Sequence, residues 1–217
     1  MARSGTQLLS GLLGAHPGVI SHGEVLNLLT DQTADDFALV ERYYRQIDQL
    51  RRTAVGITVL SEQFGFRPLT FANLLALPNM HVIVLERRDQ LNRVRSMLQA
   101  DETARWEVDA PPPEALPAVR MEPAGTLRML REATVFYDQL RQITTVPVAW
   151  VTYEELCENR DSVLEAIWWF LGVESPGSIP APTFRQESRS LTETVTNLDE
   201  IREYLVGTGY EHLLKEV

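Results

Sequence analysis

A run of small and polar residues near the N-terminus could bind an anion. Arg3, Ser4, Gly5, Thr6 and Gln7 come directly before a stretch with helical periodicity. Small residues let the backbone turn sharply, so that successive N–H groups converge at the positive end of the helix dipole. The Arg3 side chain and the Thr6 hydroxyl could close around that point, which is typical of a phosphate-type site. An ordinary N-cap at Ser4 or Thr6 is the simpler alternative.

A second group of candidate anion ligands follows an apolar run, His81 to Leu85. Ligands of open α/β sheets bind at the carboxyl ends of strands, where Arg88 would lie. Ser96 comes eight residues after Arg88, about two turns along the helix predicted there. A group held by both side chains would need Arg88 to fold back along that helix. The alternative is a solvated basic face made of Arg87, Arg88, Arg93 and Arg95.

The elements that would position these residues alternate between short apolar runs and longer segments of helical period. This alternation indicates an α/β fold with a mostly parallel sheet, whose strands are covered on both faces. The predicted strands are Gly18–Ser21, Ala54–Leu60, His81–Leu85 and Val146–Val151. The predicted helices are Thr6–Ala15, Asp35–Leu50, Thr70–Leu77, Asp89–Ala100, Pro123–Ile143, Ser162–Leu171 and Leu198–Leu205. Proline content predicts loops at Asp109–Pro117 and Glu174–Phe184.

Length and composition restrict the class of protein. A chain of 217 residues predicts a single domain over residues 1–217. The net charge of −10 argues against a nucleic-acid partner, because phosphate backbones need a basic surface. No apolar run reaches the ~20 residues of a membrane span and no secretory leader is visible, so we expect a cytoplasmic protein. The one cysteine, Cys157, excludes an internal disulfide and a cysteine-based zinc site.

Arginine is almost the only basic residue. Lys215 is the one lysine among the 20 basic residues, which leaves 19 arginines. A side chain that holds an anion is therefore expected to be an arginine, whose planar fork matches phosphate and sulfate oxygens.

The two candidate anion sites, in this order, resemble those of the sulfotransferases that use 3′-phosphoadenosine 5′-phosphosulfate (PAPS). The segment Arg3–Gln7 is similar to the family's loop for the 5′-phosphosulfate. Arg88 and Ser96 match the spacing of its ligands for the 3′-phosphate. Val151–Leu156 and Phe170–Val173 are similar to two structural landmarks of the family.

Other segments resemble one particular branch of this family. Ser10–Asn27, Phe184–Arg189, Thr194–Asn197 and the prolines 111–113 are similar to the bacterial branch that includes the nodulation-factor and trehalose sulfotransferases. The resemblance implies a three-layer α/β sandwich of the P-loop nucleotide-kinase type. It also implies transfer of a sulfuryl group from PAPS, as co-substrate, to a hydroxyl of a carbohydrate or glycolipid, without a metal. Arg185 and Gln186 would close over the nucleotide, and a homo-oligomer stays open.

The resemblance also implies a catalytic base. In this branch the base is a glutamate just after the second strand, the place that Glu24 occupies. A carboxylate within hydrogen-bond reach can take the proton of the attacking hydroxyl. His22 is the competing base, because its intrinsic pKa is nearer neutrality, and on a strand it would share a face with Glu24. The alternative is that both side chains only cap the strand.

Two departures from the family pattern keep another function open. Thr58 stands where many relatives carry a lysine, so Arg3 and the loop N–H groups would have to stabilise the transition state. Only Met1 and Ala2 precede the loop, where relatives have a hydrophobic strand, and a missing strand would expose its neighbours' edges. We expect an upstream start or trimming, although another segment could fill the gap. The alternative function is a catalytically impaired nucleotide-binding protein; a nucleotide kinase is disfavoured because the Walker lysine is absent.

Overall fold

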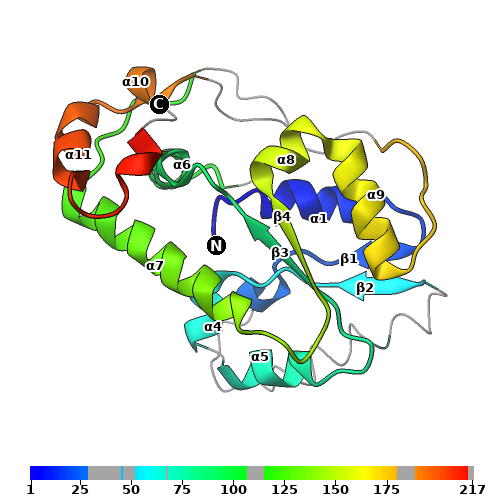
Figure 1. Ribbon diagram of the computed structural model, residues 1–217. Helices are drawn as coiled ribbons and strands as arrows, with labels where there is room; N and C mark the ends of the chain where they lie inside the picture. The colour runs from blue at the N-terminus through cyan, green and yellow to red at the C-terminus, as the bar shows by residue number, and fades with distance from the viewer. Residues whose placement is uncertain (29–44, 46–51, 67, 107–114, 180–188, 215–217) are drawn as a thin grey trace. The chain divides into compact units, whose positions relative to one another are not determined.

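The structure is a computed structural model that describes residues 1–28, 45, 52–66, 68–106, 115–179 and 189–214. The chain divides into two compact units by its internal contacts (Figure 1). The first unit comprises Met1–Glu86 and Arg141–Pro182, and the second comprises Arg87–Leu140 and Thr183–Val217. The single domain expected over residues 1–217 stays a prediction.

The strands of the first unit pair in parallel. β1 (Val19–Ser21) pairs with β2 (Ala54–Gly56), and β3 (Val82–Glu86) pairs with β4 (Val148–Thr152). Parallel neighbours need crossover connections, as the alternating pattern of the sequence predicts. The predicted α/β class with parallel pairing is confirmed, and the described strands form two two-stranded sheets. β2 is shorter than expected, because the ladder with β1 stops at Gly56.

Most helices of the first unit surround these strands close to where the sequence predicts them. They are α1 (Thr6–Gly14), α4 (Ser61–Phe66), α5 (Pro68–Leu75), α8 (Tyr153–Glu158) and α9 (Arg160–Leu171), with a 3₁₀ turn η1 (Val25–Leu28). α9 ends at Gly172, whose left-handed φ of 67° is the usual way to terminate a helix. α8 is too short for a periodic signal, but Thr152 caps it by accepting a hydrogen bond from Glu155 N at 3.2 Å.

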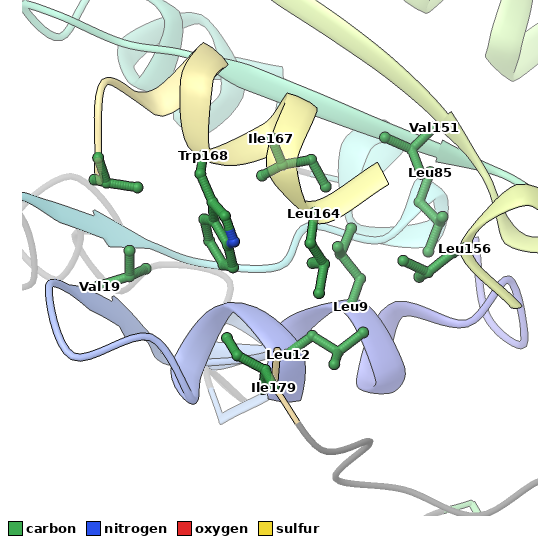
Figure 2. Packing of buried hydrophobic residues seen from close by; sticks show 11 residues of the cluster. Leu9, Leu12, Val19, Leu85, Val151, Leu156, Leu164, Ile167, Trp168 and Ile179 are labelled. Carbon is green, nitrogen blue, oxygen red and sulfur yellow. The ribbon is translucent and has the colours of Figure 1, made fainter. Parts of the chain in front are cut away.

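One hydrophobic cluster holds α1 and α9 against the strands (Figure 2). Leu9 and Leu12 recur at helical spacing on α1, and Leu12 is fully buried. Figure 2 shows Trp168 and Leu164 of α9 pointing toward α1. Burying each such side chain contributes roughly 1.5–3 kcal/mol. The packing therefore fixes α1, and with it the start of the helix where the candidate anion loop lies.

The second unit is mainly helical. It contains α6 (Gln90–Thr103), α7 (Pro123–Arg141), α10 (Leu191–Thr194), α11 (Leu198–Leu205) and the 3₁₀ turn η2 (Glu211–Leu214). α11 has the predicted bounds, and proline stands at the first position of α7, where its missing N–H has no cost. A separate core includes Leu91, Met121, Leu130 and Ile201. The predicted helix Asp35–Leu50 lies almost wholly outside the described residues.

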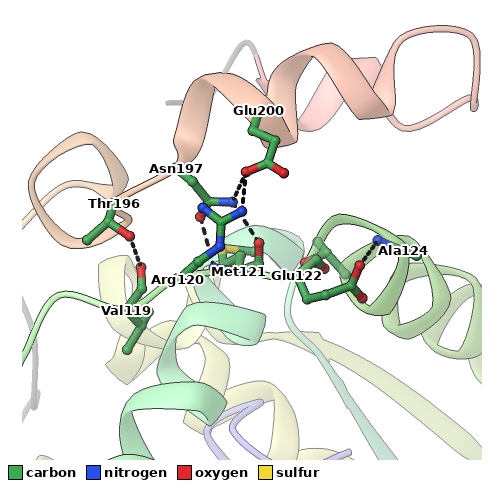
Figure 3. A network of polar contacts seen from close by, with 9 residues as sticks. Val119, Arg120, Met121, Glu122, Ala124, Thr196, Asn197 and Glu200 are labelled. Carbon is green, nitrogen blue, oxygen red and sulfur yellow. Dashed lines mark hydrogen bonds and ion pairs between the residues drawn. The ribbon is translucent and has the colours of Figure 1, made fainter.

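A pairing between two extended segments closes the second unit (Figure 3). Val119 and Val195 form a parallel bridge. The Asn197 side chain continues this pairing beyond the bridge, because its amide donates to Met121 O at 2.8 Å and accepts from Met121 N at 3.0 Å. The amide thus satisfies a backbone donor and acceptor that would otherwise need a strand partner.

Candidate active site

The loop before α1 contains two residues with a left-handed backbone. Arg3 and Gly5 adopt left-handed conformations, with φ of 62° and 93°. Gly5 is the N-cap of α1, and no side chain caps the helix there. The simpler alternative, an ordinary N-cap at Ser4 or Thr6, is therefore wrong. Gly5 has no side chain that could satisfy the first N–H groups of α1.

Ser4 gives a second, independent sign of a ligand at this loop. Its side chain is completely buried, and within the described part of the chain Ser4 Oγ has no hydrogen-bond partner. A buried hydroxyl without a partner costs about 1–3 kcal/mol, so native proteins seldom leave one. A phosphate or sulfate oxygen at the loop would satisfy it.

The structure brings Glu24 to this loop. Thr6 Oγ1 donates a long hydrogen bond to Glu24 Oε1, at 3.5 Å, between half-buried side chains. Behind this pair, Ser10 and Ser21 join their hydroxyls at 2.7 Å, which ties α1 to the end of β1. The candidate base, Glu24, thus lies beside the candidate donor loop within the first unit.

The chain turns at Gly23, directly before Glu24. Gly23 has a left-handed φ of 65°, and its carbonyl accepts hydrogen bonds from Thr58 N at 2.7 Å and Val25 N at 3.1 Å. The sequence does carry a signal for this turn, because a glycine between polar residues is typical of turns. It was not visible from the sequence that Thr58, the position of the family's lysine, would hold this turn with its backbone.

The expectation that His22 and Glu24 share a strand face is wrong. β1 ends at Ser21, and the left-handed Gly23 separates the two side chains, so strand alternation does not apply. His22 still follows the strand, because its N–H donates to Gly56 O at 3.0 Å. Its side chain is half-buried.

Arg88 and Ser96 belong to the second unit. Arg88 is exposed and lies just before Asp89, whose side chain caps α6 by accepting from Asn92 N at 3.0 Å. Ser96 is half-buried, roughly 9 Å further along the axis of α6 from its first residue. The cap marks the start of α6, so Arg88 lies just before the helix. A joint role for Arg88 and Ser96 stays a prediction.

The alternative of a solvated basic face is wrong for two of its four arginines. Arg93 and Arg95 are only 1% and 3% exposed. Arg93 Nη2 donates to Met129 O, and Arg95 Nη1 donates to Thr194 Oγ1, both at 3.3 Å. These side chains therefore join α6 to its neighbours inside the second unit.

The remaining predicted ligands, Arg185 and Gln186, lie outside the described residues. The part of the chain that the structure describes contains no cluster of three metal-ligating side chains. No helix in the described ranges is both long and apolar enough to cross a membrane.

The chain is similar to known proteins over nearly its whole length. No family model matches the chain. Nodulation protein H of Rhizobium meliloti is 30% identical over 228 residues, which cover 97% of this chain and 90% of the relative. Nodulation protein H of Rhizobium tropici is 29% identical over 221 residues, with 97% and 88% covered. A crystal structure of a mouse sulfotransferase complexed with PAP aligns with 99% of this chain and 84% of its own, at 14% identity and a TM-score of 0.47.

These findings define the class as a sulfotransferase of the bacterial branch that the sequence resembles. The chain belongs to the family of nodulation protein H. The recognition of the family and of an enzyme is confirmed, and the parallel strand pairs confirm the predicted α/β class.

Proposed function

We propose that this protein transfers a sulfuryl group from PAPS to a hydroxyl of a carbohydrate or glycolipid. The observation that carries the proposal is the pairing of Thr6 with Glu24, because it joins a candidate donor loop to a candidate base within 3.5 Å. Membership of the nodulation protein H family supports the same reaction.

The loop fits the 5′-phosphosulfate of PAPS. The N–H groups at the start of α1 and the buried Ser4 hydroxyl supply neutral donors, and Arg3 supplies a positive charge. Gly5, Thr6 and Gln7 complete the loop as further donor-binding residues. Arg88 and Ser96 would bind the 3′-phosphate, and Arg185 and Gln186 would close over the nucleotide.

The reaction needs one proton acceptor and stabilisation of negative charge. The acceptor oxygen forms a bond to sulfur, while the bond from sulfur to the bridging oxygen of the 5′-phosphate breaks. The hydroxyl proton passes to Glu24, with His22 as the competing base. The products are the sulfated acceptor and adenosine 3′,5′-bisphosphate. Arg3 and the loop N–H groups stabilise charge as it develops, so positioning and electrostatics suffice without a metal.

A catalytically impaired nucleotide-binding protein is the second candidate function. Thr58 offers no charge in place of the family's lysine, and its backbone N–H is engaged by Gly23 O at 2.7 Å. Such a protein would bind the nucleotide through the same loop and transfer nothing. A cytoplasmic location and a homo-oligomer stay predictions from the sequence.

Two measurements test the proposal. Labelled PAPS is incubated with the protein and a panel of oligosaccharides and glycolipids, and transfer to the acceptor is counted. Adenosine 5′-phosphosulfate, which lacks the 3′-phosphate, is the matched control donor and should react much more slowly. Thermal stabilisation by adenosine 3′,5′-bisphosphate but not ATP, without transfer to any acceptor, would favour the impaired binder. Stabilisation by neither nucleotide would refute both functions.

A further inference from the structure

The ring of Tyr153 lies against the glycine of the candidate donor loop. A Cβ atom added to Gly5 would lie 3.0 Å from Tyr153 Cε2, and closer still to Tyr153 Cδ2. Real Cβ atoms essentially never approach that closely. The ring therefore occupies the space that any side chain at position 5 would need, although 148 positions separate the two residues in the sequence.

Tyr153 lies at the junction of a strand and a helix that both contribute to the core of the first unit. It is the first residue of α8 and directly follows β4, whose last residue, Thr152, is 8% exposed and caps the helix. Thr152 is also in register with Glu86 of β3. One turn along α8, Leu156 is 1% exposed and belongs to the same core as Leu9 of α1. The backbone that carries the ring is thus joined to a strand and a helix, both of which pack in the core of the first unit.

The loop needs such a support. Glycine is the residue with the widest choice of backbone conformations, so an unsupported Gly5 would leave its left-handed state readily. The directions of the N–H groups at the start of α1 depend on that state of Gly5. A rigid ring against one side of Gly5 limits the alternatives, which lowers the entropy lost when an anion binds.

We propose that Tyr153 is a positioning residue that holds the Arg3–Gln7 loop in its anion-binding shape through contact with Gly5. The inference rests on the proposed function, because it assigns this loop to the sulfate donor. The inference goes beyond the proposed function, because it gives a residue of the Val151–Leu156 segment a role in donor affinity. The part of Tyr153 that matters is the ring and its contact with Gly5.

Affinity for adenosine 3′,5′-bisphosphate is the first readout. Tyr153→Ala should weaken binding about 5- to 30-fold, which corresponds to ordering one more backbone residue on binding. Tyr153→Phe keeps the ring and should restore most of the affinity. The KM for the acceptor should change little in either variant. Tyr204→Ala, at an exposed tyrosine of α11, is the matched control. A full loss with Tyr153→Phe would mean that the hydroxyl binds the ligand directly and would overturn the proposal.

A double-mutant cycle isolates the contact. Gly5→Ala should weaken binding strongly in the wild-type background and less in the Tyr153→Ala background, because the collision with the ring is then gone while the strain at φ 93° remains. Equal factors in both backgrounds would refute the contact. If Tyr153→Ala does not fold, Tyr153→Leu takes its place in the cycle.

Hydrogen exchange separates this inference from the proposed function. In the protein without nucleotide, Tyr153→Ala should speed exchange of the amides of residues 3–6, and Tyr153→Phe should not. Faster exchange in a protein whose wild type binds no bisphosphate would keep the contact and reject the proposed function. Tight binding by the wild type, together with unchanged exchange in Tyr153→Ala, would reject the positioning role alone.

Discussion

Thr6 Oγ1 lies 3.5 Å from Glu24 Oε1, so a residue at the start of α1 meets a residue after β1 at the candidate site. Glu24→Gln keeps the size and the hydrogen bond but cannot take a proton from the acceptor. Sulfate transfer should fall ~10²–10⁴-fold, the usual contribution of a positioned base, while affinity for PAPS stays nearly constant. Radiolabelled transfer and equilibrium binding measure the two effects.

His22→Ala is the matched variant for this prediction, and it should cost much less activity. A Glu24→Gln enzyme with near-normal turnover beside an inactive His22→Ala would assign the base to His22. Full activity in both variants would show that neither residue is the base.

Arg3 should carry much of the donor affinity, because it is the positive side chain of the loop and lies two residues before Gly5. Arg3→Ala removes a charge-assisted hydrogen bond and should weaken binding of adenosine 3′,5′-bisphosphate by about 1.5–3 kcal/mol. Isothermal titration calorimetry gives the value. Arg52→Ala, at an exposed arginine of the same unit, is the control and should bind normally. Unchanged affinity in Arg3→Ala would refute the loop assignment.

Arg88 should recognise the 3′-phosphate specifically. Arg88→Ala should lose about 1.5–3 kcal/mol of affinity for adenosine 3′,5′-bisphosphate but little for AMP, which lacks that phosphate. Competition binding with both nucleotides measures the difference. Arg131→Ala, at an exposed arginine of α7, controls for the loss of one charge from the second unit. Equal losses for the two nucleotides would show that Arg88 does not contact the 3′-phosphate.

His16 should stabilise the first unit. Its Nδ1 accepts from Gly18 N at 2.8 Å, its Nε2 donates to Glu174 O at 2.7 Å, and its ring centroid lies 4.7 Å from that of Trp168. His16→Leu would leave two backbone groups without their partner at a site 6% exposed, so urea unfolding should show a loss of about 2–4 kcal/mol. His212→Ala, at an exposed histidine, should change little. Equal stability of both variants would contradict this role.

Glu200 should make the stability of the second unit depend on pH in the acid range. A hydrogen bond from Asn197, and then the charge of Arg120, hold the pKa of Glu200 below its ordinary 4.5. The stabilisation is therefore complete above pH 4.5 and is lost as the pH falls through the lower, folded pKa. Thermal unfolding should show Glu200→Gln less stable than wild type at neutral pH.

The difference between wild type and Glu200→Gln should shrink as the pH falls below 4.5. Glu203→Gln, at an exposed glutamate of the same helix, should not show this pattern. A difference that does not vary with pH would mean that the carboxylate charge is not the cause.

Local patterns predicted the elements that carry local signals. β1, β3 and β4 are short valine- and isoleucine-rich runs, and α1 and α11 have apolar residues at helical spacing. The Arg3–Gln7 loop was predictable for the same reason, because its residue types and the helix after it are adjacent in the chain. The short α4 and α8 were not predicted, since a few residues cannot show a period.

The rest depends on partners far away in the sequence. The buried Arg95 donates a hydrogen bond to Thr194, which is 99 positions away. Glu24 follows a turn at Gly23, whose carbonyl accepts a hydrogen bond from the backbone of Thr58. The positive φ of Arg3 could not be predicted either, because residues other than glycine seldom adopt it. Conformations and contacts of this kind arise only when the chain has folded.

The close sequence position of Thr6 and Glu24 has a consequence for the order of folding. Only 18 positions separate them, whereas 158 separate His16 from Glu174, which lies just beyond the end of α9. Closing the shorter loop costs less entropy, so contacts around α1 and β1 can form before the C-terminal part of the unit docks. During synthesis from the N-terminus, the segments of α1 and β1 would thus be able to come together before α9 is made, and packing against α9 would complete their arrangement.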